Sequence, residues 1–291
     1  MYLYPASATM TAIRRQAGLS LVELMIALAI SSFLILGITQ VYIDNQRHYL
    51  FQQSQSGNLD SGRFASLLFE QYLSKAGYRR DPSVFLDTAF PQRPADADCL
   101  EFKEGATITG IAAANTTGFC VRYQPQASKE LDCQGEASEL IYDKATPGVV
   151  PANQLMVAAF KFEPGTGTNL ERGRLLCKSL NAKTPQFTEQ VTGIADMRLD
   201  FGITADTATA QATQYMAQSA WTVSDKPIRS VRYSLLLASR PGQRDSNDVP
   251  TLLNNWLNLS PAAVKTRIQN GDSRRVYQVV STTRTIRNLM P

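Results

Sequence analysis

Gly18-Leu19-Ser20-Leu21-Val22-Glu23 opens a stretch of sequence whose next segment, residues 24–43, contains no charged side chain. About 20 apolar residues in an α-helix span about 30 Å, which is the thickness of the hydrocarbon core of a bilayer. Arg14 and Arg15 precede the stretch, and no acidic residue does. The positive-inside rule therefore predicts that residues 1–18 face the cytoplasm and that the chain after the apolar segment lies outside it.

Three interpretations of this stretch compete. A secretory signal has an apolar region of about 7–15 residues followed by a cleavage site with small residues, but Ala27-Leu28-Ala29 lies inside the apolar segment. An ordinary transmembrane anchor explains the length but not Glu23, because a carboxylate near the mouth of a span costs free energy. The third interpretation, which we favour, is a leader that is removed after Gly18 while the apolar segment stays on the protein.

Residues 18–23 resemble the class III signal of type IV pilins and type II secretion pseudopilins. The resemblance implies that a prepilin peptidase cuts between Gly18 and Leu19 and that the new N-terminus is then methylated. It also implies that Glu23, at the fifth position of the mature chain, is the glutamate characteristic of these families. Leu19 departs from the pattern, since the first mature residue is usually phenylalanine.

The proposed cut has a physical rationale. A carboxylate in an apolar filament core needs a positively charged partner, and the ammonium group freed on Leu19 of the same or a neighbouring subunit can supply it. Pairing would neutralise Glu23 and fix the axial register of an incoming subunit. We therefore expect Gly18 and Leu19 to be processing residues, and Leu19 and Glu23 to serve subunit assembly.

The helix is expected to continue beyond the apolar segment. Residues 44–76 contain no proline, and Gly77 and Pro82 provide the stop signal. Large apolar side chains recur at helical spacing and are interpreted as core packing: Phe64, Leu67, Leu68 and Tyr72. Three glycines are points where such a helix could bend or melt: Gly37, Gly57 and Gly62.

The rest of the chain is dominated by short segments that are typical of strands. They are bounded by glycine, proline or asparagine and cover residues 118–123, 139–143, 155–162, 195–203, 230–239 and 275–283. A helix is predicted at 208–221 and a helical turn at 254–259. One long N-terminal helix, with an apolar transmembrane half and an amphipathic half, followed by antiparallel strands predicts an α+β fold with the helix packed on a β-sheet head.

The domain boundaries follow from these patterns. We expect a leader peptide at 1–18, a transmembrane or filament-core helix at 19–43, an amphipathic helix at 44–80 and a periplasmic, β-rich globular head at 81–291. The resemblance to type IV pilins implies that the protein crosses the inner membrane once and contacts lipid before assembly, and that it reaches the pilus, near the tip, afterwards.

Several later segments resemble PilW-type minor pilins. They are Ala76-Gly77-Tyr78-Arg79 at the helix exit, residues 191–202 ending in Phe201-Gly202, the Leu-rich residues 228–240, and the closing residues 275–277 and 282–288. The resemblance implies a low-abundance subunit that forms a complex with other minor pilins, primes assembly of the major pilin and works with the inner-membrane assembly machinery. A J-type pseudopilin of type II secretion is the alternative.

The four cysteines are Cys99, Cys120, Cys133 and Cys177. An even count behind an export-type N-terminus indicates two disulfides. Four cysteines allow three connectivities, and the surroundings of Cys133 and Cys177 resemble a recurrent cysteine pair of the PilW-type proteins. We favour Cys99–Cys120 and Cys133–Cys177. The second bond would close a loop of about 45 residues and stabilise the fold by about 4 kcal/mol in the loop-entropy model.

Other chemistry is not expected. The chain has one histidine, His48, too few for sites that need an imidazole base or several imidazole ligands. No catalytic residue, metal site or cofactor is therefore predicted, and a membrane-anchored periplasmic enzyme is the less favoured alternative. Removing Arg14 and Arg15 leaves 27 basic and 25 acidic residues, so we expect no nucleic-acid partner. The basic residues near the C-terminus are interpreted as a solvated strand face: Arg274, Arg275, Arg284 and Arg287.

Overall fold

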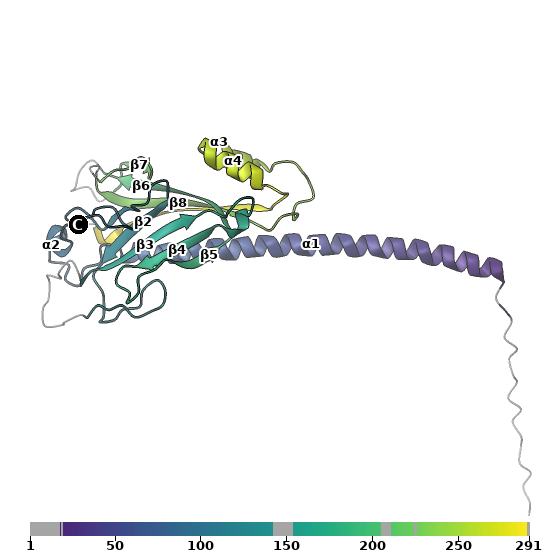
Figure 1. Cartoon of the computed structure of the whole chain (residues 1–291), viewed down its shortest axis with the longest axis horizontal. Coiled ribbons are helices and arrows are strands. Elements are labelled where there is room, and N and C mark those ends of the chain that lie inside the picture. The colour runs from purple at the N-terminus through teal and green to yellow at the C-terminus, as the bar shows by residue number, and fades with distance from the viewer. Residues whose placement is uncertain (1–17, 19, 142–153, 205–210, 224–225, 290–291) are drawn as a thin grey trace, which may run out of the picture. The chain divides into compact units, whose positions relative to one another are not determined.

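The computed structural model describes residues 18, 20–141, 154–204, 211–223 and 226–289 (Figure 1). The chain divides into two compact units, Met1–Tyr49 and Leu50–Pro291. The described part of the first unit is mainly the beginning of helix α1 (Leu21–Lys75). The second unit contains the rest of α1 and a head built on two antiparallel sheets.

Helix α1 confirms the predicted long N-terminal helix. It ends where Gly77 adopts φ +72°, a left-handed conformation that glycine enters without strain and that commonly terminates helices. The Gly77 amide then donates to the carbonyl of Arg122 at 3.1 Å. This bond ties the end of the helix to the first sheet.

The first sheet contains five strands in the order β1-β2-β3-β4-β5. Their bounds are β1 Ile108–Gly110, β2 Gly118–Tyr123, β3 Met156–Glu163, β4 Arg174–Ser179 and β5 Thr188–Thr192. The second sheet has the order β7-β6-β8-β9, with β6 Ile194–Ile203, β7 Gln214–Ala217, β8 Ile228–Ala238 and β9 Tyr277–Thr285. All neighbouring strands are antiparallel, in agreement with the predicted α+β head.

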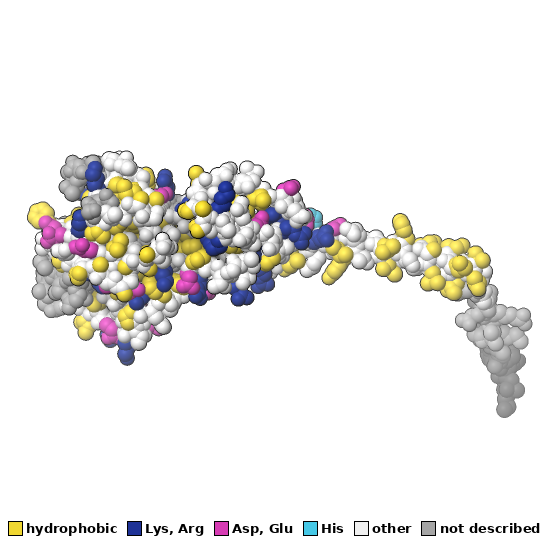
Figure 2. All heavy atoms as spheres, turned by 45° about the horizontal axis from the view of Figure 1, so that its top comes forward, with side chains coloured by type: hydrophobic (Ala, Val, Ile, Leu, Met, Phe, Trp, Pro, Cys, Tyr) yellow, Lys and Arg dark blue, Asp and Glu magenta, His cyan; other side chains and the backbone are white. Residues whose placement is uncertain are grey.

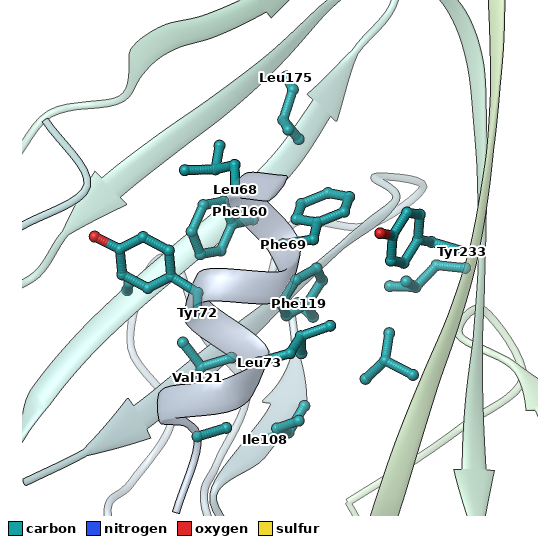
Figure 3. Close-up of a cluster of buried hydrophobic side chains, with 14 of the residues drawn as sticks. Leu68, Phe69, Tyr72, Leu73, Ile108, Phe119, Val121, Phe160, Leu175 and Tyr233 are labelled. Atoms are coloured by element: carbon teal, nitrogen blue, oxygen red, sulfur yellow. The ribbon is translucent and has the colours of Figure 1, made fainter. Parts of the chain in front are cut away.

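The second half of α1 packs against both sheets and forms the main core with them (Figure 3). The ring of Phe69 lies 5.2 Å from that of Phe119 and 5.8 Å from that of Phe160, both in the first sheet. It lies 4.8 Å from the ring of Tyr233 in β8. Edge-to-face aromatic pairs of this kind add about 0.5–1.5 kcal/mol each beyond the area that they bury.

Two short helices cover the other face of the second sheet (Figure 1): α3 (Thr251–Asn258) and α4 (Ala262–Gly271). Leu253 and Trp256 of α3 and Ile268 of α4 are buried in a second cluster with Leu236 of β8. Alternate residues of β8 therefore face α1 and the α3–α4 pair. The remaining short helices are α2 (Leu86–Ala89), η2 (Leu170–Arg172) and η3 (Arg287–Leu289).

Two local predictions are wrong. The described part of residues 208–221 contains strand β7 instead of a helix, because residues 214–217 pair with β6, and tertiary pairing overrides a weak helical preference. Residues 139–141 form no strand, and residues 142–143 of the same prediction lie outside the described residues. The predicted turn at 254–259 is the end of α3, whereas α4, β1, β4 and β5 were not predicted.

Gly62 is a contact point rather than a weak point of α1. It is buried, and a Cβ built on it would lie 2.7 Å from Cγ2 of Val280 and 3.1 Å from Cδ1 of Leu237. The missing side chain lets the helix approach β8 and β9 closely. Gly57 differs, because a Cβ built there meets no described atom within 4 Å.

This contrast predicts opposite effects of the same substitution. Gly62→Ala should lower the free energy of unfolding by about 1–2 kcal/mol, because the overpacking cost exceeds the gain in helix propensity. Gly57→Ala should raise it by up to about 1 kcal/mol. Urea unfolding of the head, followed by tryptophan fluorescence, would measure both changes. Equal effects of the two substitutions would contradict the close approach at Gly62.

Candidate subunit-assembly site

Gly18 is exposed, and a Cβ built on it would meet no described atom within 4 Å. Packing within the described chain therefore does not require a glycine at this position, and its role in processing stays a prediction. Leu19 lies outside the described residues. Its pairing with Glu23 stays a prediction.

Glu23 lies in the first turn of α1, where its side chain is exposed. The backbone amide of Leu24 donates to the carbonyl of Ser20 at 3.1 Å, so the helical bonds begin at this turn. A carboxylate here interacts favourably with the positive end of the helix dipole. The position thus suits a negative charge even before any partner arrives.

The side chains of residues 21–43 are exposed, and most of them are large and apolar (Figure 2). Phe33 is 79% exposed and Leu36 is 70% exposed. The few polar groups are satisfied within the helix, since Ser32 donates to the Leu28 carbonyl at 2.8 Å and Thr39 donates to the Ile35 carbonyl at 2.7 Å. The helix is long and apolar enough to cross a membrane. Together with the motif at Gly18–Glu23, it indicates membrane anchoring.

The apolar stripe predicted on the second half of α1 is only half correct. Leu68 and Tyr72 are buried in the core, but Phe64 is 50% exposed and Leu67 is 63% exposed. The buried face instead follows Asn58, Gly62, Ala65, Leu68, Phe69, Tyr72, Leu73 and Ala76. Spacing could not separate the two faces, because Phe64 and Leu68 are themselves four residues apart. The head therefore presents two large apolar side chains on α1 to its surroundings.

The C-terminal end of the chain lies along α1. Arg284 of β9 forms an ion pair with Glu70 at 2.6 Å, and Asn288 donates to the carbonyls of Ser74 and Ala76. The solvated strand face expected from the basic residues is therefore wrong in part. Arg274 and Arg287 are exposed, but Arg284 is engaged with the helix.

Arg275 departs most from the expected solvated strand face, because its side chain is buried and the residue is only 1% exposed. Its guanidinium donates to the carbonyls of Gly271, Ser239 and Thr168 and pairs with Glu171 at 2.6 Å. It joins the start of β9 to the loop before η2, and it is no surface cation.

Arg122 is a second buried cation that sequence reasoning missed. Its guanidinium donates to the carbonyls of Phe90, Pro91, Lys103 and Ala106 at 2.6–3.0 Å. Burial, and secondarily the charge of Arg93, lowers the pKa of Arg122 to about 9, so it remains charged at pH 7. In the sequence, Arg122 reads as an outward position of a strand, and no local signal reveals the loop that covers it.

The two disulfides join Cys99 to Cys120 and Cys133 to Cys177, the pairs favoured from the sequence. The first ties the segment before β1 to β2, and the second ties the loop after β2 to β4. Each bond therefore attaches a segment outside the strands to a strand of the first sheet.

Two family models match the chain. The prokaryotic N-terminal methylation motif matches residues 13–39, and the type IV pilus-assembly protein W model matches residues 163–288. No curated protein matches. Among solved structures, a type IV-like pilin from Thermus thermophilus is similar, with 12% sequence identity and a TM-score of 0.38 over 81% of this chain and 98% of that one.

A class III processing motif, an exposed apolar helix and an antiparallel β head on the same helix define a type IV pilin-like protein. The match across the second sheet and the surrounding segments makes the chain a PilW-like type IV pilin, a minor pilin of the type IV pilus.

The cage around Arg122 gives a prediction. Arg122→Lys should lower the free energy of unfolding by about 2–4 kcal/mol, because a lysine cannot reproduce the guanidinium fork and would leave buried carbonyls without donors. Arg232→Lys is the matched control. Arg232 is half-exposed and pairs with Asp200 at 3.0 Å, so its replacement should change stability by no more than about 0.5 kcal/mol. Urea titrations would measure the free energy of unfolding of both variants. A similarly small decrease in the two variants would contradict a structural role for Arg122.

Proposed function

We propose that a prepilin peptidase removes residues 1–18 and that the mature chain then primes assembly of the pilus as part of a minor-pilin complex. In this proposal residues 19–43 occupy first the membrane and then the filament core. Residues 44–80 comprise the amphipathic part of the helix, which ends at Lys75, and the exit from it. Residues 81–291 form the head on the periplasmic side. The observation that carries the proposal is the methylation motif at residues 13–39, which includes most of the exposed apolar part of α1.

The chemistry of assembly would reside at the new N-terminus. Cleavage after Gly18 creates an ammonium on Leu19, and Glu23 is the first carboxylate of the mature chain. An ion pair between them, within a subunit or between neighbours, would remove the cost of burying either charge in an apolar core. An incoming subunit that is shifted along the filament axis would place its ammonium group out of reach of Glu23 and leave this carboxylate unpaired. The ion pair would therefore select the correct axial position.

The head would contribute a contact of its own through Phe64 and Leu67. These side chains lie on the exposed face of α1 with Asp60, Arg63 and Gln71 around them. Exposed apolar side chains rimmed by polar ones are typical of protein contacts. We propose that another pilin covers them, while the inner-membrane machinery handles the subunit. The chain would act as a structural subunit without catalysis.

Processing is directly testable. Co-expression with a prepilin peptidase should shorten the chain by 18 residues, and intact-mass measurement should place the new N-terminus at Leu19. Gly18→Asp should block the cut. Glu23→Gln should be cut normally but fail to restore pili in a strain that lacks the gene, because the ammonium on Leu19 would lose its partner. An uncleaved wild-type chain would refute the proposal.

The head contact has a separate test. The double variant Phe64→Ser and Leu67→Ser should keep the wild-type unfolding midpoint, since both side chains are largely exposed, but it should reduce the number of pili at least tenfold. Leu259→Ser is the control, because Leu259 is 77% exposed and lies after α3. Normal piliation with the double variant would show that this face of α1 is not a contact.

Deletion of the gene should abolish pili and leave type II secretion intact.

A further inference from the structure

An open, polar pocket of about 450 Å³ lies between the loop that follows β8 and the turn that precedes β9. Its lining consists of Pro241, Gly242, Arg244, Asn247, Asp272, Ser273 and Arg274. All of these residues belong to the second unit of the chain. The pocket is therefore formed by the head alone.

The two walls of the pocket are tied to each other. The Gly242 amide donates to the Ser273 carbonyl at 2.8 Å. The Arg244 amide donates to the Arg274 carbonyl, also at 2.8 Å. The Arg244 guanidinium donates to both carboxylate oxygens of Asp272, at 3.2 and 3.1 Å. Because these bonds join the loop to the turn, the pocket is already formed before a ligand arrives.

The side chains of the lining that remain available can all donate hydrogen bonds. Asn247, Ser273 and Arg274 are exposed, and their side chains make no hydrogen bond or ion pair among the described residues. An amide, a hydroxyl and a guanidinium can each donate, and the guanidinium can only donate. A ligand that presents several acceptor oxygens therefore matches this lining.

The charge of the lining is positive. Arg244 and Arg274 outnumber Asp272, and the ion pair between Arg244 and Asp272 leaves the charge of Arg274 uncompensated. Asp245 and Asp248 belong to the same loop, but they do not line the pocket. A guanidinium binds the oxygens of phosphate in pairs, with charge-assisted hydrogen bonds. The lining thus combines the charge and the donors that a phosphate group requires.

The pocket adjoins the part of α1 that follows the apolar segment. The Ser54 hydroxyl donates to the side-chain oxygen of Gln243 at 3.4 Å. The Asn58 amide donates to the Val276 carbonyl at 3.2 Å. Ser54 comes eleven positions after Ile43, the last residue of the apolar segment, and a helix of that length covers about 17 Å. With the apolar segment in the membrane, the phosphates closest at hand are those of lipid headgroups.

We propose that this pocket binds the phosphate of an anionic lipid headgroup, with Arg274 as the main contact and Asn247 and Ser273 as further donors. The inference rests on the proposed membrane anchor and gives the head a lipid contact of its own. This contact holds the head against the bilayer until the subunit enters the filament, because a subunit that leaves the membrane also leaves the headgroup behind.

The test uses the full chain in lipid nanodiscs of two compositions. One contains only phosphatidylcholine, whose choline cation offsets its phosphate, and the other also contains phosphatidylglycerol. Hydrogen exchange, measured by mass spectrometry, should be about fivefold slower for residues 241–247 and 272–275 in the anionic nanodiscs, as expected for one arginine at an anionic surface. Glycerol phosphate in solution should not slow exchange in the neutral nanodiscs. Equal protection by this soluble phosphate at the same concentration would overturn the lipid assignment.

Variants then test the residues of the pocket. Arg274→Gln should abolish the difference between the nanodiscs. Asn247→Asp, which places a carboxylate in the lining, should weaken the difference and serves if Arg274→Gln does not fold. Arg172→Gln is the matched control, because Arg172 is exposed in η2, whose Glu171 pairs with Arg275, and lies outside the lining. It removes the same charge from the same end of the head and should leave the difference intact.

The outcomes separate the pocket from the anchor. Equal losses with Arg172→Gln and Arg274→Gln would show attraction by general surface charge and would overturn the pocket. An anchored wild-type chain with equal exchange in both nanodiscs would refute this inference alone. A chain that elutes apart from the nanodiscs would refute the membrane anchor together with it.

Discussion

Burial of one helix between two sheets is the interaction on which the head depends. Phe69 is fully buried, and its ring contacts aromatic rings from both sheets, so each sheet completes its core against the same helical turn. Gly62 permits the close approach of β8 and β9, and Gly77 ends the helix where the first sheet begins. The exposed face of α1 that carries Phe64 and Leu67 follows from this arrangement, because the sheets cover only the opposite face of the helix.

The same helix meets two different physical demands. Residues 24–43 carry no charge and are exposed on every side within the part of the chain that the structure describes, which suits an environment without water. Within the head, α1 is buried along one face and polar along most of the other. Phe64 and Leu67 interrupt that polar face. They are the residues of the head helix that we propose another pilin covers.

Features encoded locally could be predicted from the sequence. The motif from Gly18 to Glu23, the long helix and strands β2, β6 and β8 rest on spacing and turn residues, and the structure has them at nearly the expected positions. Features created by distant parts of the chain could not be predicted. Strand β7 exists because β6 offers it an edge, and Arg122 is buried because the loop at residues 90–106 covers it. The exposure of Phe64 depends on which face of α1 the sheets cover, which helical periodicity does not encode.

The C-terminal segment makes contacts that form late in folding, and this timing affects how the subunit is made. Arg284 pairs with Glu70, and Asn288 binds the carbonyl of Ser74, each across 214 positions of sequence. Such long-range contacts form late, because a long loop must close first. While a nascent chain is still being made, its anchor can already be inserted, but the core around Phe69 lacks the strand that closes it. The head is therefore completed only once the residues that contact Glu70 and Ser74 have emerged, and a chain truncated before β9 would leave its core open.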